Sequence, residues 1–515
     1  IPFSSEEILR IFKQQGNIII STNNYYNLSK EELIKKAIKF HSEGNISKAK
    51  RYYQNCIDKG FNDPTVFSNY GIILKGHGKL KEAEWYQRKS IEIDPNNAGA
   101  HINLGNILLD IGKPKEAEIS LRKAITLKPN NEIAHYNLGL ILKDLGKLIE
   151  AQKSIKKSIK LNKCFAMAYN DLALIENDLG NIEDAELSLR KCIKINPNLA
   201  SAQNNLGEIL RNLGKLKEAE ESARKAIKIQ PNFQKAYLTL GNILKGYGKI
   251  KEAEIYILEA IKIDKEYSDA YIILSDIYRI NGNIEDAERV LLIAININPE
   301  CAYPHYNLGQ VLRDKGQYES AIISYRKASE LISDNDFIIA EIIKLLSLLS
   351  DWDSATKYIP LLNKLGLKNS SIDPYKLLHL EDDPKYELEL AKKFYKEKYK
   401  KITTSIKKIK KKKINVGYFS ADFKTHPVMR LLARILELHN RSKFNIYIYS
   451  FTEFEDKDTQ RAKEAAYCFR SIHKISDIEV VKLARKDQID IAIDLMGYTQ
   501  NNRMDIFSYR VAPIQ

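Results

Sequence analysis

The chain has 515 residues, a formal net charge of +15 and a hydrophobic content of 44%, enough apolar material for substantial cores and, by length, for about three domains. Its five cysteines show no CxxC spacing and no histidines at zinc intervals, so the sequence predicts neither a disulfide framework nor a metal site and favours a reducing, cytoplasmic location. The longest apolar window, Phe337 to Trp352, contains Glu341 and Lys344 and is too short to span a bilayer, so no membrane span is expected.

Residues 1–29 precede the repetitive part of the chain, and we expect them to form an N-terminal helical cap. The chain begins at Ile1 rather than Met and stops at Gln515 inside an apparent motif. We therefore expect a piece of a longer protein, in which the lack of a signal peptide is uninformative.

A 34-residue period dominates the sequence from residue 30 onward. Alanine recurs at this spacing at positions 49, 83, 117, 151, 185, 219, 253, 287, 321 and 355, and glycine stands five residues before each of the first nine. Small residues let two antiparallel helices approach closely, glycine turns the chain between them, and prolines such as Pro95 and Pro129 end the second helix. These features are typical of a tetratricopeptide array, in which each helix pair needs its neighbours to cover its apolar face.

Nine repeats are predicted from about residue 30 to residue 333. A tenth keeps Ala355 but has Ser350 in place of the turn glycine, and we interpret it as a degenerate capping repeat. The predicted fold of residues 30–363 is therefore an α-solenoid. Such a superhelix offers a long concave surface, so we expect a protein or peptide to bind along it, and a homodimer through the repeats is a further expectation.

A row of asparagines lies two residues before the small position on the first helix of many repeats. Its members are Asn69, Asn103, Asn137, Asn205 and Asn307, and Asp171, Thr239 and Ile273 interrupt the series. A carboxamide donates to one carbonyl and accepts from one N–H, so a stacked row is able to hold a peptide main chain without reading its sequence. In the alternative, the amides bond to adjacent repeats and only stiffen the stack. The sequence leaves both open.

Residues 364–413 form a basic linker that we expect to be helical. Between Lys385 and Lys413 it carries 13 lysines and three glutamates. A run such as 407–413 is able to bind phosphate groups, but lysine is also the ordinary residue of a solvated helix face. The aromatic residues fall at helical spacing, which favours a packing stripe over a base-stacking platform. They are Tyr386, Phe394, Tyr395 and Tyr399. We therefore do not expect nucleic acid as a partner.

The period changes at Ile414. Apolar strands are predicted at 414–421, 444–451 and 489–495, alternating with helices at 429–438, 459–466 and 478–486. Short apolar strands that alternate with helices indicate a parallel α/β sheet. Residues 414–515 are therefore predicted to form a separate, partial α/β domain.

Two polar stretches follow the predicted strands, SADFKTHPV after the first and DLMGYTQNNR after the third. Sites in parallel sheets lie at the carboxyl ends of the strands. The sequence contains neither GxGxxG nor a P-loop. Asp456 and Asp458 have a spacing that some metal sites use, but they lie in a polar loop, and we do not expect them to bind metal.

Four blocks follow the repeats in order: VGYFSADFKTHPV, ELHNRSKFNIYIYSF, IDIAIDLMGYT and RVAPIQ. They resemble the amino-terminal catalytic lobe of the O-GlcNAc transferase and SPINDLY family, which couples tetratricopeptide repeats to a two-lobed glycosyltransferase. The resemblance implies a Rossmann-like lobe of the GT-B type, truncated, with the second lobe absent. It also implies inverting transfer of a sugar from UDP-GlcNAc, or from GDP-fucose in the SPINDLY branch, to Ser or Thr of proteins. No metal or other cofactor is expected.

The resemblance places His426 in the cleft between the lobes, where it would handle the acceptor or the phosphate. Asp494 falls where a carboxylate would take the proton of the acceptor hydroxyl, directly or through water. Further substrate contacts are expected from Pro427, Tyr498, Thr499 and Arg503. A base within reach of the hydroxyl and donors for the departing diphosphate are the chemical needs. In the alternative, His426 caps the next helix and Asp494 bonds to local backbone amides.

Two departures from the family pattern stand near the end of the chain. Where the family has Arg-Pro-Ala-Pro, this sequence has RVAP from Arg510, and the second lobe, with most nucleotide-sugar contacts, does not follow. We expect the front part of a protein O-glycosyltransferase, inactive by itself. The competing hypothesis is a peptide-binding scaffold whose lobe has lost catalysis.

Overall fold

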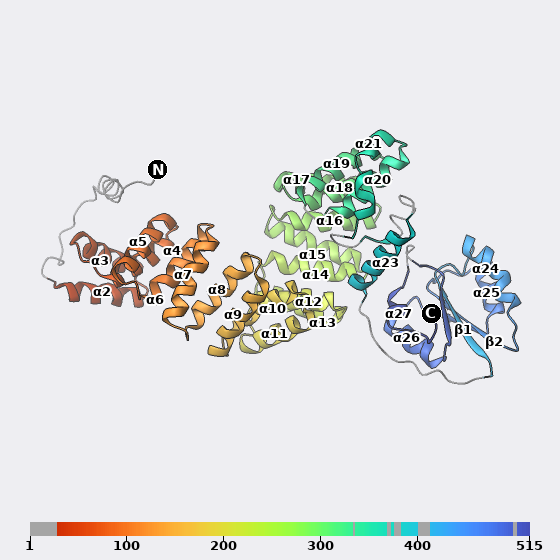
Figure 1. Ribbon diagram of the computed structural model, residues 1–515, viewed down its shortest axis with the longest axis horizontal. Helices are drawn as coiled ribbons and strands as arrows, with labels where there is room; N and C mark the ends of the chain where they lie inside the picture. Colours follow the sequence, from red (N-terminus) through yellow and green to blue (C-terminus); the bar gives the residue numbers. More distant parts are fainter. Residues whose placement is uncertain (1–27, 333–334, 368–371, 375–382, 400–411, 498–501) are drawn as a thin grey trace. The chain divides into compact units, whose positions relative to one another are not determined.

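The structure is a computed structural model that describes residues 28–332, 335–367, 372–374, 383–399, 412–497 and 502–515 (Figure 1). The expected cap at 1–29 lies almost wholly outside the described residues. The chain divides into two compact units, Ile1–Lys265 and Glu266–Gln515. None of the described helices combines the length and the apolar character that a membrane span requires.

The first unit is a stack of antiparallel helical hairpins. They pair α2 (Lys30–Ser42) with α3 (Ile46–Asp58), α4 (Pro64–Gly76) with α5 (Leu80–Ile93), α6 (Ala98–Asp110) with α7 (Pro114–Leu127), α8 (Glu132–Asp144) with α9 (Leu148–Leu161), α10 (Ala166–Asp178) with α11 (Ile182–Ile195), α12 (Ala200–Asn212) with α13 (Leu216–Ile229), and α14 (Gln234–Gly246) with α15 (Ile250–Ile263). Consecutive first helices, such as α4 and α6, also contact each other directly, which puts them on the inner side of the stack. The predicted solenoid is confirmed.

The repeated small residues allow the close helix packing and the turns that the 34-residue period predicted. The periodic alanines, for example Ala117 and Ala151, are fully buried. Gly112 turns the chain between α6 and α7 with φ of 81°, a conformation that side chains rarely adopt. A Cβ on Gly139 would lie 2.5 Å from Cδ1 of Ile155, so the first helix must carry a residue without a side chain where the second helix crosses it.

An ion-pair lattice ties the second helices together on their exposed side. Arg122 Nε donates to Glu118 Oε1 at 2.9 Å, and its Nη2 donates to Glu150 Oε2 of the next repeat at 2.7 Å. The same arrangement recurs at Arg88, Arg190 and Arg224. The arginines and the glutamates that they reach in the next repeat are about half exposed. Such an ion pair contributes little alone, but together the pairs bridge neighbouring repeats.

The second unit begins with two further hairpins and a shorter helix pair. It contains α16 (Ser268–Ile280) with α17 (Ile284–Ile297), α18 (Ala302–Asp314) with α19 (Tyr318–Leu331), α20 (Asp336–Leu348) with α21 (Trp352–Thr356), a 3-10 helix (Ile359–Lys364) and α23 (Pro384–Lys398). In the turn before α21, Ser350 has φ of 56°, the left-handed conformation that glycine takes in the other turns. This supports the interpretation of a degenerate repeat.

Helix α23 packs its aromatic stripe as predicted. Tyr386, Leu390 and Phe394 are buried, and Tyr386 and Leu390 join the core formed by α18 to α20. The Tyr386 hydroxyl donates to the carbonyl of Leu365 at 2.9 Å. The described lysines of α23 are mostly exposed, as expected for a solvated helix face.

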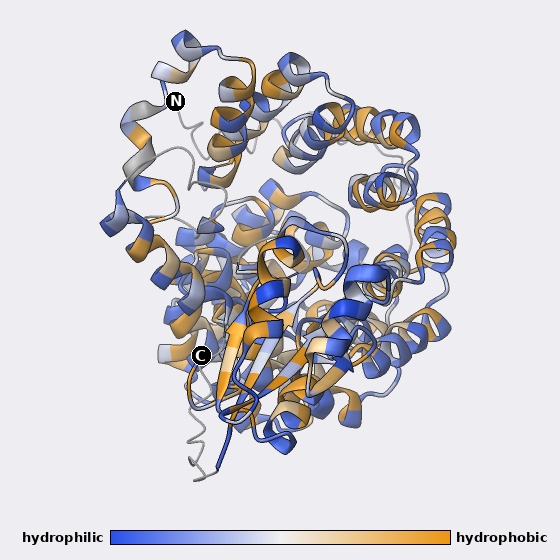
Figure 2. Ribbon diagram, turned by 90° about the vertical axis from the view of Figure 1, so that its right-hand side faces the viewer, coloured by the Kyte–Doolittle hydropathy of each residue, from blue (hydrophilic) through white to orange (hydrophobic). Residues whose placement is uncertain are grey.

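The C-terminal part is a four-stranded parallel sheet in the order β3-β2-β1-β4. Its elements are β1 (Ile414–Ser420), α24 (Pro427–Leu438), β2 (Phe444–Ser450), α25 (Lys457–Ala465), β3 (Cys468–Ser471), α26 (Asp477–Lys486), β4 (Ile491–Asp494) and α27 (Asp505–Ser508). The core places α24 and α25 on one face of the strands and α26 and α27 on the other (Figure 1). The strands of the sheet are largely hydrophobic in the colouring of Figure 2. The three predicted strands are confirmed, whereas β3 and α27 were not predicted.

Candidate active site

The site lies where the sheet order reverses. From β1 the chain runs outward through β2 to the edge strand β3, and then β4 returns to the other side of β1. Phe419 of β1 pairs with Asp494 of β4. The chain leaves these two strand ends toward opposite faces, and ligands of open parallel sheets bind in the crevice that opens at such a point.

Asp494 ends β4 and is half buried. Its Oδ1 accepts a hydrogen bond from the backbone N–H of Met496 at 3.0 Å, and its Oδ2 accepts from Gly497 at 2.9 Å. Burial raises the pKa of this carboxyl above its ordinary value, and the two N–H groups partly oppose the shift. The alternative of local backbone bonding is thus observed, yet each oxygen keeps a lone pair for an acceptor hydroxyl.

Met496 links the ends of β1 and β4, and no sequence pattern marked it as a site residue. Its sulfur accepts hydrogen bonds from Ser420 Oγ at 3.3 Å and from the backbone N–H of Ala421 at 3.4 Å, and the residue is 5% exposed. The thioether therefore lies between the loop that follows β1 and the turn that follows β4.

His426 is the N-cap residue of α24. Its Nδ1 accepts a hydrogen bond from the backbone N–H of Val428 at 3.3 Å, and Asp422 Oδ2 lies 3.5 Å from the same nitrogen. Accepting at Nδ1 assigns the proton of the neutral ring to Nε2. The capping alternative is therefore observed, but it uses only one ring nitrogen, and the side chain is 39% exposed.

Asp456 caps α25 and clamps the loop that carries His426. Its carboxylate accepts from the backbone N–H groups of Thr425 at 2.6 Å and Thr459 at 3.0 Å. These bonds hold the pKa of Asp456 well below its usual range. Thr459 Oγ1 donates to the carbonyl of Phe423 at 2.7 Å. The Asp456 oxygens thus accept backbone N–H groups of the loop and of α25, which gives Asp456 a structural role.

Of the other expected substrate contacts, the structure describes only some. Pro427 is exposed at the first position of α24. Tyr498 and Thr499 lie outside the described residues. Arg503 donates to Asp477 Oδ1 at 2.6 Å and to the carbonyls of Ile472 and Ile475, both at 2.7 Å. These bonds brace the segment before α27 against the loop after β3, and a substrate contact by Arg503 stays a prediction.

The asparagine row bonds to preceding helices. Asn69 Nδ2 donates to Tyr53 Oη, Asn103 to Ser68 Oγ, Asn137 to Asn106 Oδ1, and Asn205 to Asn170 Oδ1, at 2.8 to 3.2 Å. Asn307 is half buried. At least part of the role of these amides is therefore the alternative one, in which they bond to neighbouring helices and stiffen the stack. It uses one donor of each of the four amides, and a carboxamide has a second N–H and a carbonyl oxygen that can also bond.

Comparison with known proteins assigns both parts of the chain. Residues 385–515 match Glycosyl transferase family 41. Tetratricopeptide repeat families match 86–119, 105–146, 133–163, 166–199, 200–233, 234–267, 268–301 and 302–335.

Curated relatives match over about a fifth of the chain. A probable UDP-N-acetylglucosamine–peptide N-acetylglucosaminyltransferase of Arabidopsis thaliana, SEC, is 32% identical over 105 residues, which cover 20% of this chain and 11% of SEC. SPINDLY of the same plant, named as the same kind of enzyme, is 31% identical over 106 residues, 20% of this chain and 12% of SPINDLY. The matched stretch is thus a small part of the length of these relatives.

Among solved structures, a mutant of the Thermobaculum terrenum O-GlcNAc transferase aligns with a TM-score of 0.35 and 25% identity, covering 55% of this chain and 49% of that one. By its family matches, the chain joins an array of tetratricopeptide repeats to a segment that matches glycosyl transferase family 41.

Proposed function

We propose that the chain forms the acceptor-binding array and the amino-terminal lobe of a protein O-glycosyltransferase. The observation that carries this proposal is the pairing of Asp494 with Phe419, at the end of the strand whose following loop leads to His426. This pairing lies at the reversal point of the sheet, within the segment that matches glycosyl transferase family 41. The names of SEC and SPINDLY support UDP-GlcNAc as the donor, and GDP-fucose is the alternative.

In the proposed reaction the hydroxyl oxygen of an acceptor Ser or Thr attacks the anomeric carbon of the sugar. The bond from that carbon to the diphosphate breaks, and the nucleoside diphosphate leaves with the bonding electrons. Asp494 takes the hydroxyl proton, directly or through water, and its raised pKa brings it nearer to neutrality as a base. His426 Nε2–H donates to negative charge that develops in the crevice. The reaction inverts the anomeric centre and needs no metal.

The repeats supply the acceptor. The first helices line the inner side of the stack and carry Asn69, Asn103 and Asn137, whose positions are fixed by the preceding helices. A rigid row of amides loses little entropy on binding an extended main chain. A cytoplasmic location and a homodimer through the repeats belong to the same proposal.

The test uses the protein joined to a second catalytic lobe. Transfer of labelled GlcNAc from UDP-GlcNAc, and of fucose from GDP-fucose, to an unstructured Ser/Thr-rich polypeptide is measured by mass spectrometry. Transfer from one of the two donors is the expected result. Transfer from neither donor, with acceptor binding intact, would instead support the peptide-binding scaffold.

A further inference from the structure

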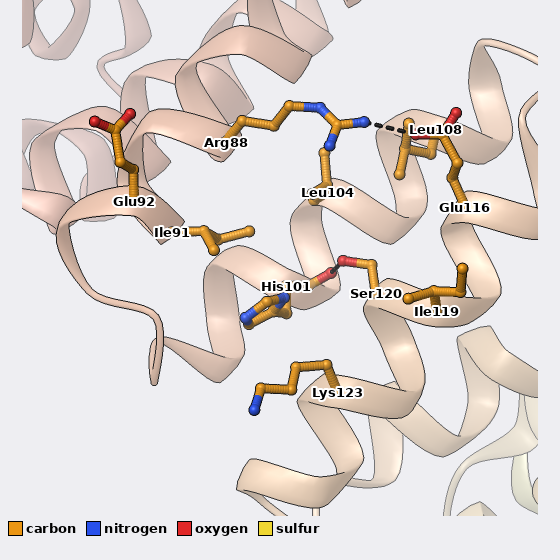
Figure 3. Close-up of a pocket in the computed structure, with 10 residues that line it drawn as sticks. All are labelled: Arg88, Ile91, Glu92, His101, Leu104, Leu108, Glu116, Ile119, Ser120 and Lys123. Atoms are coloured by element: carbon orange, nitrogen blue, oxygen red, sulfur yellow. Dashed lines mark hydrogen bonds and ion pairs between the residues drawn. The ribbon is translucent and has the colours of Figure 1, made fainter.

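A pocket of about 570 Å³ opens between α5, α6 and α7, far along the chain from the α/β domain (Figure 3). Ile91, Leu104 and Leu108 give it an apolar lining, and His101 and Ser120 also face it. Charged side chains stand at its mouth, namely Arg88, Glu92, Glu116 and Lys123. A pocket of this size with apolar walls and a few polar groups has the character of a binding site.

One repeat earlier, the chain fills the corresponding space with its own aromatic rings. The residues 34 positions before His101, Leu104, Ile119 and Ser120 are Phe67, Tyr70, Trp85 and Tyr86. The Tyr86 ring packs against the other three, with centroid distances of 6.0 Å to Phe67, 4.9 Å to Tyr70 and 4.8 Å to Trp85. In the repeat that forms the pocket, smaller side chains stand at these positions, and the corresponding space is open.

The side chains that replace these rings leave an apolar edge exposed. Ile119 is 70% exposed, although it stands where Trp85 packs one repeat earlier. Ser120 Oγ donates to the carbonyl of His101 at 2.9 Å, so its hydroxyl is satisfied. His101 is 9% exposed, and its Nε2 lies 3.1 Å from the carbonyl of Pro95. This bond makes Nε2 the donor and leaves Nδ1 as an acceptor.

The charges at the mouth are unevenly paired. Arg88 bonds to Glu84 and Glu116, and Glu92 bonds to Lys89 at 3.0 Å. Among the described residues, Lys123 is in no ion pair, and it is exposed. The uncompensated charge beside the pocket is therefore positive, which favours an anionic group on whatever enters.

We propose that this pocket receives an aromatic side chain of a partner polypeptide, with an acidic residue of that polypeptide placed against Lys123. The ring takes the place that Tyr86 holds one repeat earlier. It packs on Ile91, Leu104 and Ile119, and a phenol or indole donor is able to bond to Nδ1 of His101. Aromatic anchors in preformed pockets dominate the energetics of such contacts. The proposal does not depend on transferase activity.

The probe is a library of short random peptides displayed on phage, selected on the purified chain. The expected consensus is an aromatic residue next to Asp or Glu. A consensus without an aromatic residue, or no enrichment, contradicts the proposal. The affinity of one selected peptide is then measured by fluorescence polarisation.

Ser120→Tyr places a ring in the pocket, as Tyr86 does one repeat earlier, and should lower the affinity for this peptide by about tenfold or more. Ser154→Tyr, at the same position of the next repeat, should leave the affinity unchanged. Equal effects of the two variants, or none, overturn the assignment of the pocket. Circular dichroism shows whether Ser120→Tyr is folded, and if it is not, Ile119→Lys, which copies Lys153 of the next repeat, takes its place. Lys123→Glu should lower the affinity for the peptide several-fold. If the chain instead self-associates in a way that the peptide disrupts, the occupant is a second copy and the proposal is wrong.

Discussion

The Asp456 carboxylate accepts a hydrogen bond from the backbone N–H of Thr425 at 2.6 Å. Because Asp456 also caps α25, this contact fastens the second helix of the α/β domain to the loop that presents His426. Asp456, whose spacing from Asp458 is one that some metal sites use, is thus a positioning residue for the candidate active site.

Asp456→Ala should loosen this loop and lower the stability of the α/β domain. The pKa of Asp456 is depressed in the folded state, so its contribution is present above the ordinary Asp pKa and is lost as the pH falls through the depressed value. The difference from wild type in urea unfolding should therefore shrink on acidification below the ordinary Asp range. Asp458→Ala, which leaves the cap intact, is the control. Equal damage by both variants, together with sensitivity to EDTA, would point to a metal site.

His426→Asn separates capping from chemistry. Asn is a good N-cap residue, so this variant should keep the stability of α24, whereas His426→Ala should lose roughly 1 kcal/mol. Both should lower turnover of the two-lobed protein by about 100-fold if Nε2 acts on the reacting groups. Full activity of His426→Asn would reduce the histidine to a helix cap.

The acid side of the pH–rate profile should report Asp494. Burial raises its pKa, so the rate should begin to fall, on lowering the pH, at a value above that of an ordinary aspartate. The sign for stability is opposite to that of Asp456: the protonated form is favoured by folding, and this contribution is lost as the pH rises through the raised pKa. Asp494→Asn should lower turnover by about 100-fold or more. An unchanged profile in that variant would exclude Asp494 as the base.

The combined variant Asn69→Ala, Asn103→Ala and Asn137→Ala tests the asparagine row. If the amides hold an acceptor backbone, binding of an unstructured polypeptide should weaken by about 1 kcal/mol for each lost pair of hydrogen bonds. Some loss of stability is also expected, because each amide donates to a preceding helix. If the variant is less stable but its affinity is unchanged, the asparagine row only stiffens the stack and does not bind the acceptor.

The hairpins could be predicted because their cause is local and repeated. A buried alanine, a positive-φ glycine and a close helix crossing recur every 34 residues. The central strands β1 and β2 were visible as apolar runs. Strand β3, Cys468–Ser471, is a short edge strand of half-buried and exposed residues, so it lacks the apolar run that marks a buried strand.

The site was only partly predictable, for a different reason. The two strand ends that carry Asp494 and the His426 loop follow from the sheet order, but their contacts depend on tertiary packing. Nothing in the sequence distinguishes Met496 as the acceptor between the two strand ends, or shows that Asp456 reaches Thr425. Likewise, sequence spacing could not decide which donors of Arg503 are used by Asp477 and by the carbonyls of Ile472 and Ile475.

Calorimetric titration of the 515-residue chain tests most directly whether these residues form the acceptor side of a transferase site. The chain should bind an unstructured Ser/Thr-rich polypeptide and show no measurable affinity for UDP-GlcNAc or GDP-fucose, because catalysis requires donor and acceptor to be held in one geometry and the donor is expected to bind mainly to a second lobe. A micromolar dissociation constant for either nucleotide sugar, or no binding of the polypeptide, would contradict it.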